Sequence, residues 1–295
     1  MQRITLLIVV VLTGVTVLVG RLYYQDQLQA TADQAHEQLA ASAGIDAEEL
    51  EVQDDEEADE AAVVLEEAAE DENELEESAY DEEELEQLTS ELPNSIADRI
   101  TERLSAGEAV RVLTVGTRSS TDAEDEGLTP WPGLLEEELN EAYGEGTFQF
   151  TNVSFGGFTT EEIVEQNRHD DLADNEADIL LLEGFNWNNN LAVVTGDDAH
   201  EQIDAIAEAA TADNSDLITV LHPSPPAYET SIYPDQVADF ADFAEEEGYV
   251  YINHWEAWPD LDDEELLDYV TEERMPNQDG HTLWAEAIRP YLVTQ

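Results

Sequence analysis

The sequence predicts an α/β fold: a three-layer α/β/α domain built on a parallel five-stranded sheet. Two observations carry this prediction. Five short apolar runs in the C-terminal two thirds of the chain have the length of buried strands, and segments with helical spacing of apolar residues alternate with them. Strictly alternating strands and helices favour right-handed crossovers and a parallel sheet covered on both faces. The five runs are Val110–Val115, Phe148–Val153, Ile179–Leu182, Leu217–Leu221 and Tyr249–Ile252.

The predicted helices are amphipathic. In the first of them, Ile96, Ile100 and Leu104 share one face, and Gly107 ends the helix. Between the strands the pattern continues in the same way, which places each helix against the sheet. These further helices are Pro132–Tyr143, a helix from Thr160, Glu201–Ala210, Gln236–Glu247, Glu264–Val270 and Thr282–Tyr291.

The charge of the chain is extreme. It has 73 acidic residues and 9 basic ones, a formal net charge of −64, and every base is an arginine. Self-repulsion of this size opposes a compact state at low ionic strength, whereas about 1 M salt shortens the screening length to about 3 Å. We therefore expect a protein adapted to high salt. Nucleic acid is an unsuitable partner for so acidic a surface. The absence of cysteine excludes disulfides and thiolate chemistry.

The N-terminal segment predicts a membrane anchor. Ile4–Gly20 is apolar and uncharged, lies between Arg3 and Arg21, and spans about 25 Å as a helix. A cleaved signal peptide is the alternative, but the run is long for one and no small-residue cleavage site precedes Arg21. Residues 1–21 are therefore predicted to form a single-pass transmembrane anchor in the cell membrane, with the C-terminal domain extracellular.

Residues 22–92 are predicted to form an acidic stalk that is partly helical or disordered. Asp46–Glu91 consists almost wholly of Glu, Asp and Ala, and its apolar residues are too sparse for a core. No loop with the ligand pattern of a specific calcium site is visible in it. The folded domain is predicted to span residues 93–295.

Polar residues gather where the predicted strands end. The first strand runs into Gly116–Thr121, and the second into Gly156 and Gly157; Asn188 follows the third, and His281 comes late in the chain. In open α/β sheets such strand ends converge on one crevice. A serine hydroxyl beside backbone N–H groups and an amide is the set that acyl transfer requires. The alternative is an ordinary strand-to-helix turn with hydroxyl caps.

The order of these blocks resembles the SGNH (GDSL-type) hydrolase family over Val110–Leu292. The resemblance rests on the segments VGTRSST, WPGLLEEEL, NVSFGGFTT, LLEGFNWNNN and MPNQDGHTLWAEAI. It implies the flavodoxin-like SGNH fold, Ser119 as the nucleophile, and Gly157 and Asn188 as donors to the oxyanion.

The sequence also departs from the family pattern. Where the family has Gly-Asp-Ser, Gly116 is followed by Thr-Arg, so that Ser119 reaches the nucleophile position only through a shift of one residue. Where the family has Asp-x-x-His, the register gives Glu272 and Met275, and a thioether cannot take a proton from serine. His281 is the nearby imidazole, as either a packing residue or a base.

Two further histidines, His222 and His254, end strands and are possible substitute bases. A metal site built from these histidines has no recognisable spacing. Four tryptophans fall in or beside the strand-end loops, where aromatic rings suit sugars, although burial in the core is the simpler reading. They are Trp131, Trp187, Trp255 and Trp258.

Two functions are compatible with these residues and with the resemblance. One is an extracytoplasmic SGNH-type esterase that hydrolyses an acylated carbohydrate or another small ester of the cell envelope, with no cofactor or metal and with a monomeric catalytic domain. The other is a catalytically degenerate SGNH-fold binding module of the cell envelope. The replacement of the Asp-x-x-His block by Glu272 and Met275 leaves it uncertain whether the protein is an enzyme.

Overall fold

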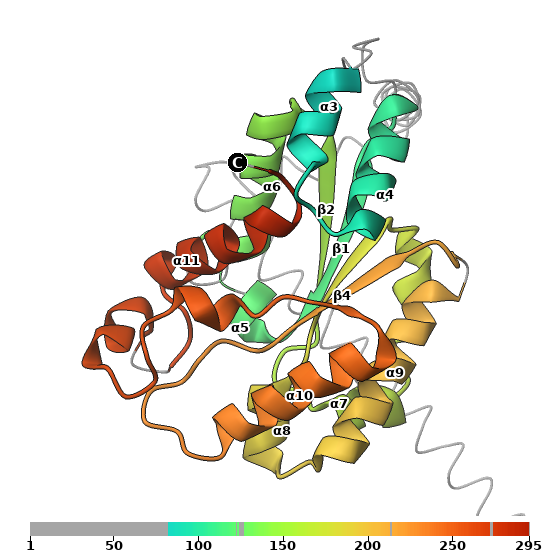
Figure 1. The fold of residues 1–295 in the computed structure, drawn as a ribbon. Helices are drawn as coiled ribbons and strands as arrows, with labels where there is room; N and C mark the ends of the chain where they lie inside the picture. Colours follow the sequence, from blue (N-terminus) through green and yellow to red (C-terminus); the bar gives the residue numbers. More distant parts are fainter. Residues whose placement is uncertain (1–81, 122, 124–126, 213, 272–273, 295) are drawn as a thin grey trace, which may run out of the picture. The chain divides into compact units, whose positions relative to one another are not determined.

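A computed structural model describes residues 82–121, 123, 127–212, 214–271 and 274–294 (Figure 1). The chain divides into two units, Met1–Glu72 and Asn73–Gln295, and the described residues all belong to the second. The predicted anchor and most of the predicted stalk lie outside the described residues. None of the helices in the described ranges combines the length and hydropathy that a membrane crossing requires.

The described unit is built on a parallel sheet with the strand order β2-β1-β3-β4-β5. In the register, Val112 of β1 pairs with Phe150 of β2 on one side and Ile179 of β3 on the other. The predicted α/β fold with a five-stranded parallel sheet is confirmed. The strands are β1 (Val110–Gly116), β2 (Phe148–Ser154), β3 (Ile179–Glu183), β4 (Ile218–His222) and β5 (Val250–Tyr251).

Helices cover both faces of this sheet (Figure 1). The α-helices are α3 (Glu82–Thr89), α4 (Asn94–Ser105), α5 (Arg118–Thr121), α6 (Trp131–Tyr143), α7 (Thr160–Glu165), α8 (Asn186–Ala192), α9 (Gly196–Thr211), α10 (Tyr233–Glu247) and α11 (Gln278–Ile288). Short 3-10 helices are η3 (Leu172–Asn175), η4 (His254–Ala257), η5 (Glu264–Tyr269) and η6 (Arg289–Tyr291). The segment predicted as a helix over Glu264–Val270 is thus the 3-10 helix η5.

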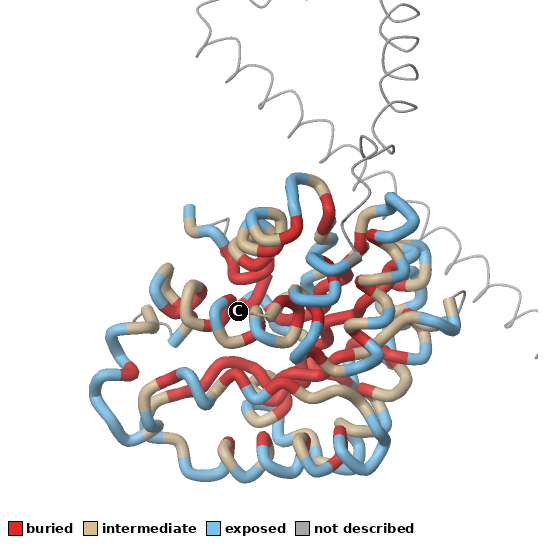
Figure 2. The backbone as a smooth tube through the Cα atoms, turned by 45° about the horizontal axis from the view of Figure 1, so that its top comes forward, coloured by how far each residue is buried: buried red, intermediate tan, exposed pale blue. Residues whose placement is uncertain are grey.

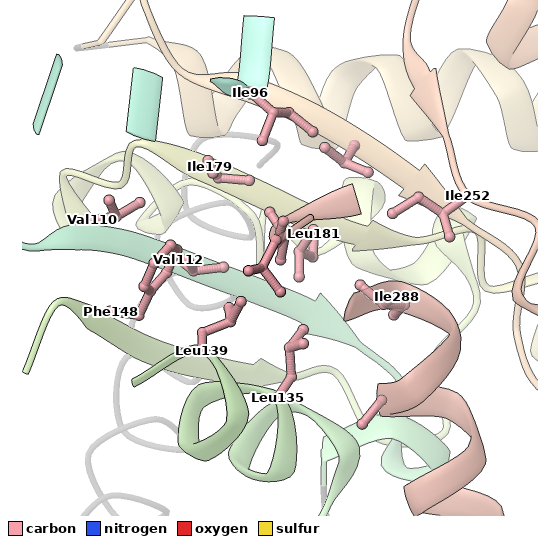
Figure 3. Packing of buried hydrophobic residues seen from close by; sticks show 14 of the residues in the cluster. Ile96, Val110, Val112, Leu135, Leu139, Phe148, Ile179, Leu181, Ile252 and Ile288 are labelled. Carbon is pink, nitrogen blue, oxygen red and sulfur yellow. The ribbon is translucent and has the colours of Figure 1, made fainter. Parts of the chain in front are cut away.

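The two faces of the sheet bury separate cores because successive side chains of a strand point to opposite sides. Val112 and Leu181 belong to the core under α4, α6 and α11 (Figure 3). Leu113 and Leu182, one residue further along each strand, belong to the core under α7, α9 and α10. The central strands β1 and β3 therefore form a buried middle layer between helices whose outer faces are exposed, whereas most residues of the edge strand β2 are exposed or half-buried (Figure 2). Burial on both faces explains why β1 and β3 read as continuous apolar runs.

The folded domain begins before residue 93, earlier than predicted. Leu85 of α3 is only 2% exposed and Leu92 is also buried, both within the first core. The backbone N–H of Thr294 donates to the carbonyl of Leu88 at 2.7 Å. Leu85 and Leu88 stand three residues apart and share one face of α3, and Leu92 follows in the turn after the helix. Residues 82–92 thus belong to the domain rather than to the stalk.

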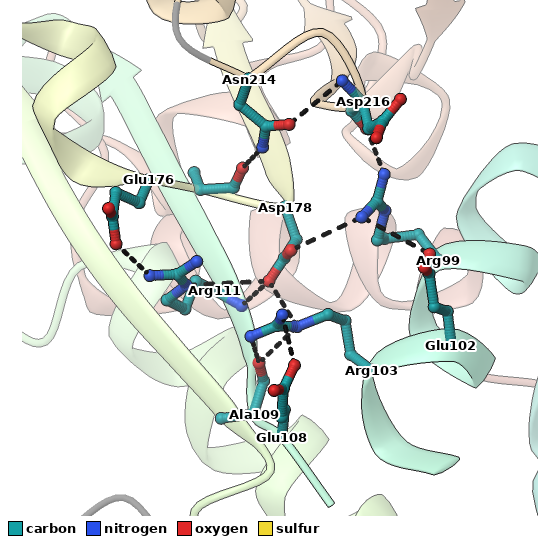
Figure 4. A network of polar contacts seen from close by, with 11 residues as sticks. Arg99, Glu102, Arg103, Glu108, Ala109, Arg111, Glu176, Asp178, Asn214 and Asp216 are labelled. Atoms are coloured by element: carbon teal, nitrogen blue, oxygen red, sulfur yellow. Dashed lines mark hydrogen bonds and ion pairs between the residues drawn. The ribbon is translucent and has the colours of Figure 1, made fainter. Parts of the chain in front are cut away.

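Asp178, directly before β3, is the centre of an ion-pair cluster at the amino-terminal edge of the sheet (Figure 4). Its carboxylate accepts a 2.8 Å hydrogen bond from the backbone N–H of Arg111 and lies 3.3 Å from Nε of Arg103. Arg99 lies 3.9 Å away. Three of the nine bases of the chain thus surround one buried carboxylate, which ties α4 to the starts of β1 and β3.

Candidate functional site

The candidate site begins at the turn that follows β1. Gly116 ends the strand with no room for a side chain, because a Cβ there would collide with Oγ of Ser120 and lie 2.7 Å from Oε2 of Glu183. The short helix α5 follows at once and carries Ser119 and Ser120, both buried. The close approach of this turn to the end of β3 therefore depends on glycine.

Glu183, the last residue of β3, holds three strand ends together. Its carboxylate accepts hydrogen bonds from the backbone N–H of Thr117 at 2.8 Å and from the hydroxyls of Thr117 at 3.0 Å and Ser120 at 2.9 Å. The hydroxyl of Ser224, after β4, donates to it at 2.5 Å. Complete burial raises the pKa of Glu183, and the bonds from Ser224, Thr117 and Ser120 partly oppose this rise.

Ser119 faces a thioether. Its hydroxyl donates to Sδ of Met275 at 3.3 Å, and its backbone N–H donates to Oγ1 of Thr117 at 3.2 Å. Ser119 is only 4% exposed. Because the thioether sulfur is a weak acceptor and not a base, this pair cannot activate the hydroxyl for attack.

A tight loop places Met275 opposite Ser119. Val270 and Pro276 form an antiparallel bridge, and the N–H of Thr271 donates to the carbonyl of Met275 at 2.7 Å. The N–H of Met275 donates back to the hydroxyl of Thr271 at 3.3 Å. Glu272, the predicted partner of the missing histidine, lies outside the described residues.

One of the two predicted oxyanion donors, Asn188, is engaged within the protein. Nδ2 of Asn188 donates to the carbonyl of Phe158 at 2.9 Å and to that of Gly156 at 3.3 Å, which uses both of its N–H groups. The carbonyl of Gly156 also accepts the backbone N–H of Arg118 at 3.2 Å. Gly157 is exposed in the same turn. The structure therefore brings Asn188 and the glycine turn together, as the blocks predict, but with the amide of Asn188 turned to backbone carbonyls.

The three candidate bases His222, His254 and His281 are buried. The pKa of each is lowered because burial penalises the charged imidazole. His281 accepts a hydrogen bond on Nδ1 from the backbone N–H of Trp131 at 3.3 Å, and its pKa falls to about 4. Nδ1 of His222 donates to the carbonyl of Pro223 at 3.2 Å, and its pKa is also about 4.

His254 donates from Nε2 to the carbonyl of Pro223 at 2.9 Å and accepts from the indole N–H of Trp258 at 3.1 Å. Among the described residues, no histidine is hydrogen-bonded to Ser119 or Ser120. His281 thus has the packing contact, and the structure does not bring it to Ser119 as a base.

Sequence reasoning did not find Glu183 or Ser224. Both lie at strand ends: Glu183 is the last residue of β3, within the segment LLEGFN, and Ser224 lies two residues after β4, within HPSPP. A carboxylate at the end of an otherwise apolar run was an available signal, because a buried charge requires partners.

Comparisons with known proteins identify the fold. No protein-family model matches the sequence, and no curated protein matches it. Among solved structures, a G-D-S-L-family protein from Desulfitobacterium hafniense DCB-2 is 16% identical with a TM-score of 0.50 and covers 62% of this chain and 99% of its own. A carbohydrate esterase family 3 protein from Talaromyces cellulolyticus is 15% identical with a TM-score of 0.52 and covers 62% and 96%. The fold is that of the SGNH/GDSL hydrolases.

Within the SGNH fold, the contact between Ser119 and Met275 agrees with the register expected from the PNQDGH segment. The thioether stands where the family resemblance expects the catalytic imidazole, and it meets the serine of the first block. No group of three or more His, Asp or Glu side chains suited to a metal ion occurs in the part of the chain that the structure describes.

Proposed function

We propose that this SGNH-fold domain is a binding module that does not hydrolyse esters. The hydrogen bond from Ser119 to Met275 is the observation that carries the proposal. Ester hydrolysis by serine needs a base that takes the hydroxyl proton, and the thioether cannot take it. The lowered pKa values of His222 and His281, together with their engagement in other hydrogen bonds, leave them poor substitutes.

The hydrogen bonds that Asn188 makes within the protein support the same proposal. A serine esterase stabilises the tetrahedral intermediate with preorganised N–H groups that point at the reacting oxygen. Here Asn188 gives both of its side-chain N–H groups to backbone carbonyls, and the N–H of Arg118 also donates to Gly156. The hydroxyl of Ser119 and one of the two predicted oxyanion donors are therefore engaged elsewhere.

An active esterase on an acylated carbohydrate or cell-envelope ester is the other function, and the shared fold favours it. It would require the Ser119 hydroxyl to exchange Met275 for a base. The two functions differ in a property that can be measured, namely serine-dependent turnover.

The test is ester hydrolysis by the full-length protein, with p-nitrophenyl acetate as the probe. The wild type is expected to hydrolyse it no faster than S119A. M275H places an imidazole opposite Ser119 and is expected to gain serine-dependent hydrolysis of up to about 10²-fold, the low end of what a positioned base contributes. M275L is the matched control and should gain nothing. Wild-type hydrolysis that S119A abolishes would overturn the proposal.

We also propose that Ile4–Gly20 anchors the module in the cell membrane with the domain on the outer side. The length and apolar character of this segment and the flanking Arg3 and Arg21 support the proposal. In cells, the protein should fractionate with membranes, and protease added outside should remove the domain. Release of the full-length protein into the soluble fraction would contradict it.

A further inference from the structure

Three aromatic rings from separate elements meet beside the candidate site. Tyr233 at the start of α10 lies between Trp187 of α8, at 5.0 Å between ring centroids, and Trp255 of η4, at 5.2 Å. Tyr233 is buried, whereas the two indoles are only partly buried. We call these three residues the aromatic patch.

Hydrogen bonds fix the orientation of the aromatic patch. The hydroxyl of Tyr233 donates to the carbonyl of Pro225 and the indole N–H of Trp255 donates to that of Ser224, both at 2.8 Å. Both acceptors belong to the buried loop after β4, which contains three prolines. Because the rings are already ordered, a ligand that stacks on them binds with little loss of side-chain entropy.

Large exposed aliphatic side chains adjoin the aromatic patch. Leu191, 65% exposed, stands four residues after Trp187 and so on the same face of α8. Ile232, 66% exposed, directly precedes Tyr233. In a chain with 73 acidic residues, aromatic and aliphatic side chains grouped in this way mark a binding surface.

Carboxylates accompany the patch in sequence: Glu229 and Asp235 lie on either side of Tyr233, and Glu256 follows Trp255, all three exposed. They repel an anionic ligand, and they are hydrogen-bond acceptors for hydroxyl groups. An indole presents an apolar face with a polar edge, which suits a ring with apolar C–H groups and many hydroxyls. We propose that the aromatic patch binds a sugar ring of a neutral carbohydrate by stacking against Trp187 and Trp255.

The patch is continuous with the candidate site. The backbone N–H of Trp187 donates to Oγ of Ser224 at 3.4 Å, and that hydroxyl donates to Glu183, which holds the turn of Ser119. The backbone that carries Trp187 is therefore hydrogen-bonded to the residues that hold the turn of Ser119. The inference rests on the proposed function only in that the bound carbohydrate is retained and not hydrolysed.

The experiment measures binding of the full-length protein to immobilised neutral polysaccharides, with xylan, β-glucan and galactomannan as probes and polygalacturonate as the anionic comparison. The buffer contains about 1 M KCl, which shortens the electrostatic screening length to about 3 Å. It also contains a polyoxyethylene detergent without sugar groups. We expect retention on at least one neutral probe, weakened about tenfold by W187A and by W255A, as loss of an aromatic contact of about 1.4 kcal/mol implies. L267A removes an exposed leucine of η5 and should leave binding unchanged.

W187F keeps an aromatic face and should retain most of the binding, which separates stacking from a general effect on folding. Quenching of tryptophan fluorescence by the retained probe in the wild type gives a second readout that needs no variant. Retention on none of the neutral probes would overturn the inference, as would equal binding by W187A, W255A and the wild type. Preference for polygalacturonate over the neutral probes would overturn it too. Serine-dependent ester hydrolysis would refute the proposed function while leaving tryptophan-dependent binding intact.

Discussion

Replacing Asp178 with alanine tests the ion-pair cluster at the amino-terminal edge of the sheet. The Asp178 side chain is 3% exposed, whereas its partners Arg99 and Arg103 are 16% and 21% exposed. Removing one partner of a buried, hydrogen-bonded ion pair costs about 3–5 kcal/mol. Because the arginines retain some contact with water, we expect the low end, about 3 kcal/mol. For a domain of this size this corresponds to a decrease of about 6–12 °C in Tm.

The sign of this effect makes the test sharp. Removing an acid from a chain with a net charge of −64 relieves repulsion, so an ordinary carboxylate substitution should be neutral or stabilising at low salt. E176Q is the matched control, because Glu176 pairs with Arg111 at 2.9 Å but is 77% exposed, and such pairs contribute about 0–1 kcal/mol. Thermal and urea unfolding of the full-length variants would measure the difference. If D178A were as stable as E176Q, the cluster would not stabilise the fold and the reasoning would be refuted.

Three further predictions concern stability. As pH falls from about 6.5 to 4, His281 is protonated in the unfolded chain before it is protonated in the folded one, because its folded pKa is about 4, so its contribution to stability should fall. H281N keeps an acceptor for the N–H of Trp131, and thermal melts across this range should show a change in stability that differs from that of the wild type by about 3 kcal/mol. E183A removes the acceptor of four donors and should lower the free energy of unfolding in urea by about 3 kcal/mol, against about 1 kcal/mol for S224A. Equal values would contradict the view that Glu183 holds three strand ends together. The Tm of the folded domain should rise between low and about 1 M NaCl, and an unchanged Tm would refute the salt adaptation.

The sheet could be predicted because its strands satisfy a simple physical condition. Strands buried on both faces, such as β1 and β3, must be apolar at nearly every position, and few other segments of this acidic chain have that property. The edge strand β5 and the first described helix, α3, were harder to predict. β5 spans only Val250 and Tyr251, and α3 packs on the core through Leu85 and Leu88 within an acidic run, so composition alone assigned it to the stalk.

The asparagine-rich segment after β3 shows where local preference misleads. Asparagine favours turns, and the four asparagines within Asn186–Asn190 predict a loop, yet the structure forms the helix α8 there. Tertiary contacts account for the difference. Oδ1 of Asn189 accepts the backbone N–H and the hydroxyl of Thr160 at the start of α7, and Oδ1 of Asn186 accepts the N–H of Ser224. These bonds join segments far apart in the chain, so no local pattern could reveal them.

Residues of the candidate site could be predicted where the spacing within a sequence segment gives their position. Residues brought to the site by contacts between distant segments could not. The PNQDGH segment fixes the position of Met275 without any structural knowledge, and the structure indeed sets Met275 against Ser119. By contrast, the position of Glu183 at the end of an apolar run indicates that its carboxylate needs partners, but not that these are the hydroxyls of three residues from other segments. Its role depends on the turns after β1 and β4 meeting at the end of β3.

The chemistry of this arrangement can be argued without the family resemblance. For Ser119 to attack an ester, its proton must pass to a group with affinity for it near neutral pH. Met275, the group in contact, has none. Glu183 is the buried carboxylate that contacts this turn, but its oxygens already accept four donors and it bonds Ser120 and not Ser119. Nδ1 of His281 already accepts a hydrogen bond from the backbone N–H of Trp131. Since a proton on Ser119 has no acceptor among these groups, the arrangement favours the proposed binding module over an esterase.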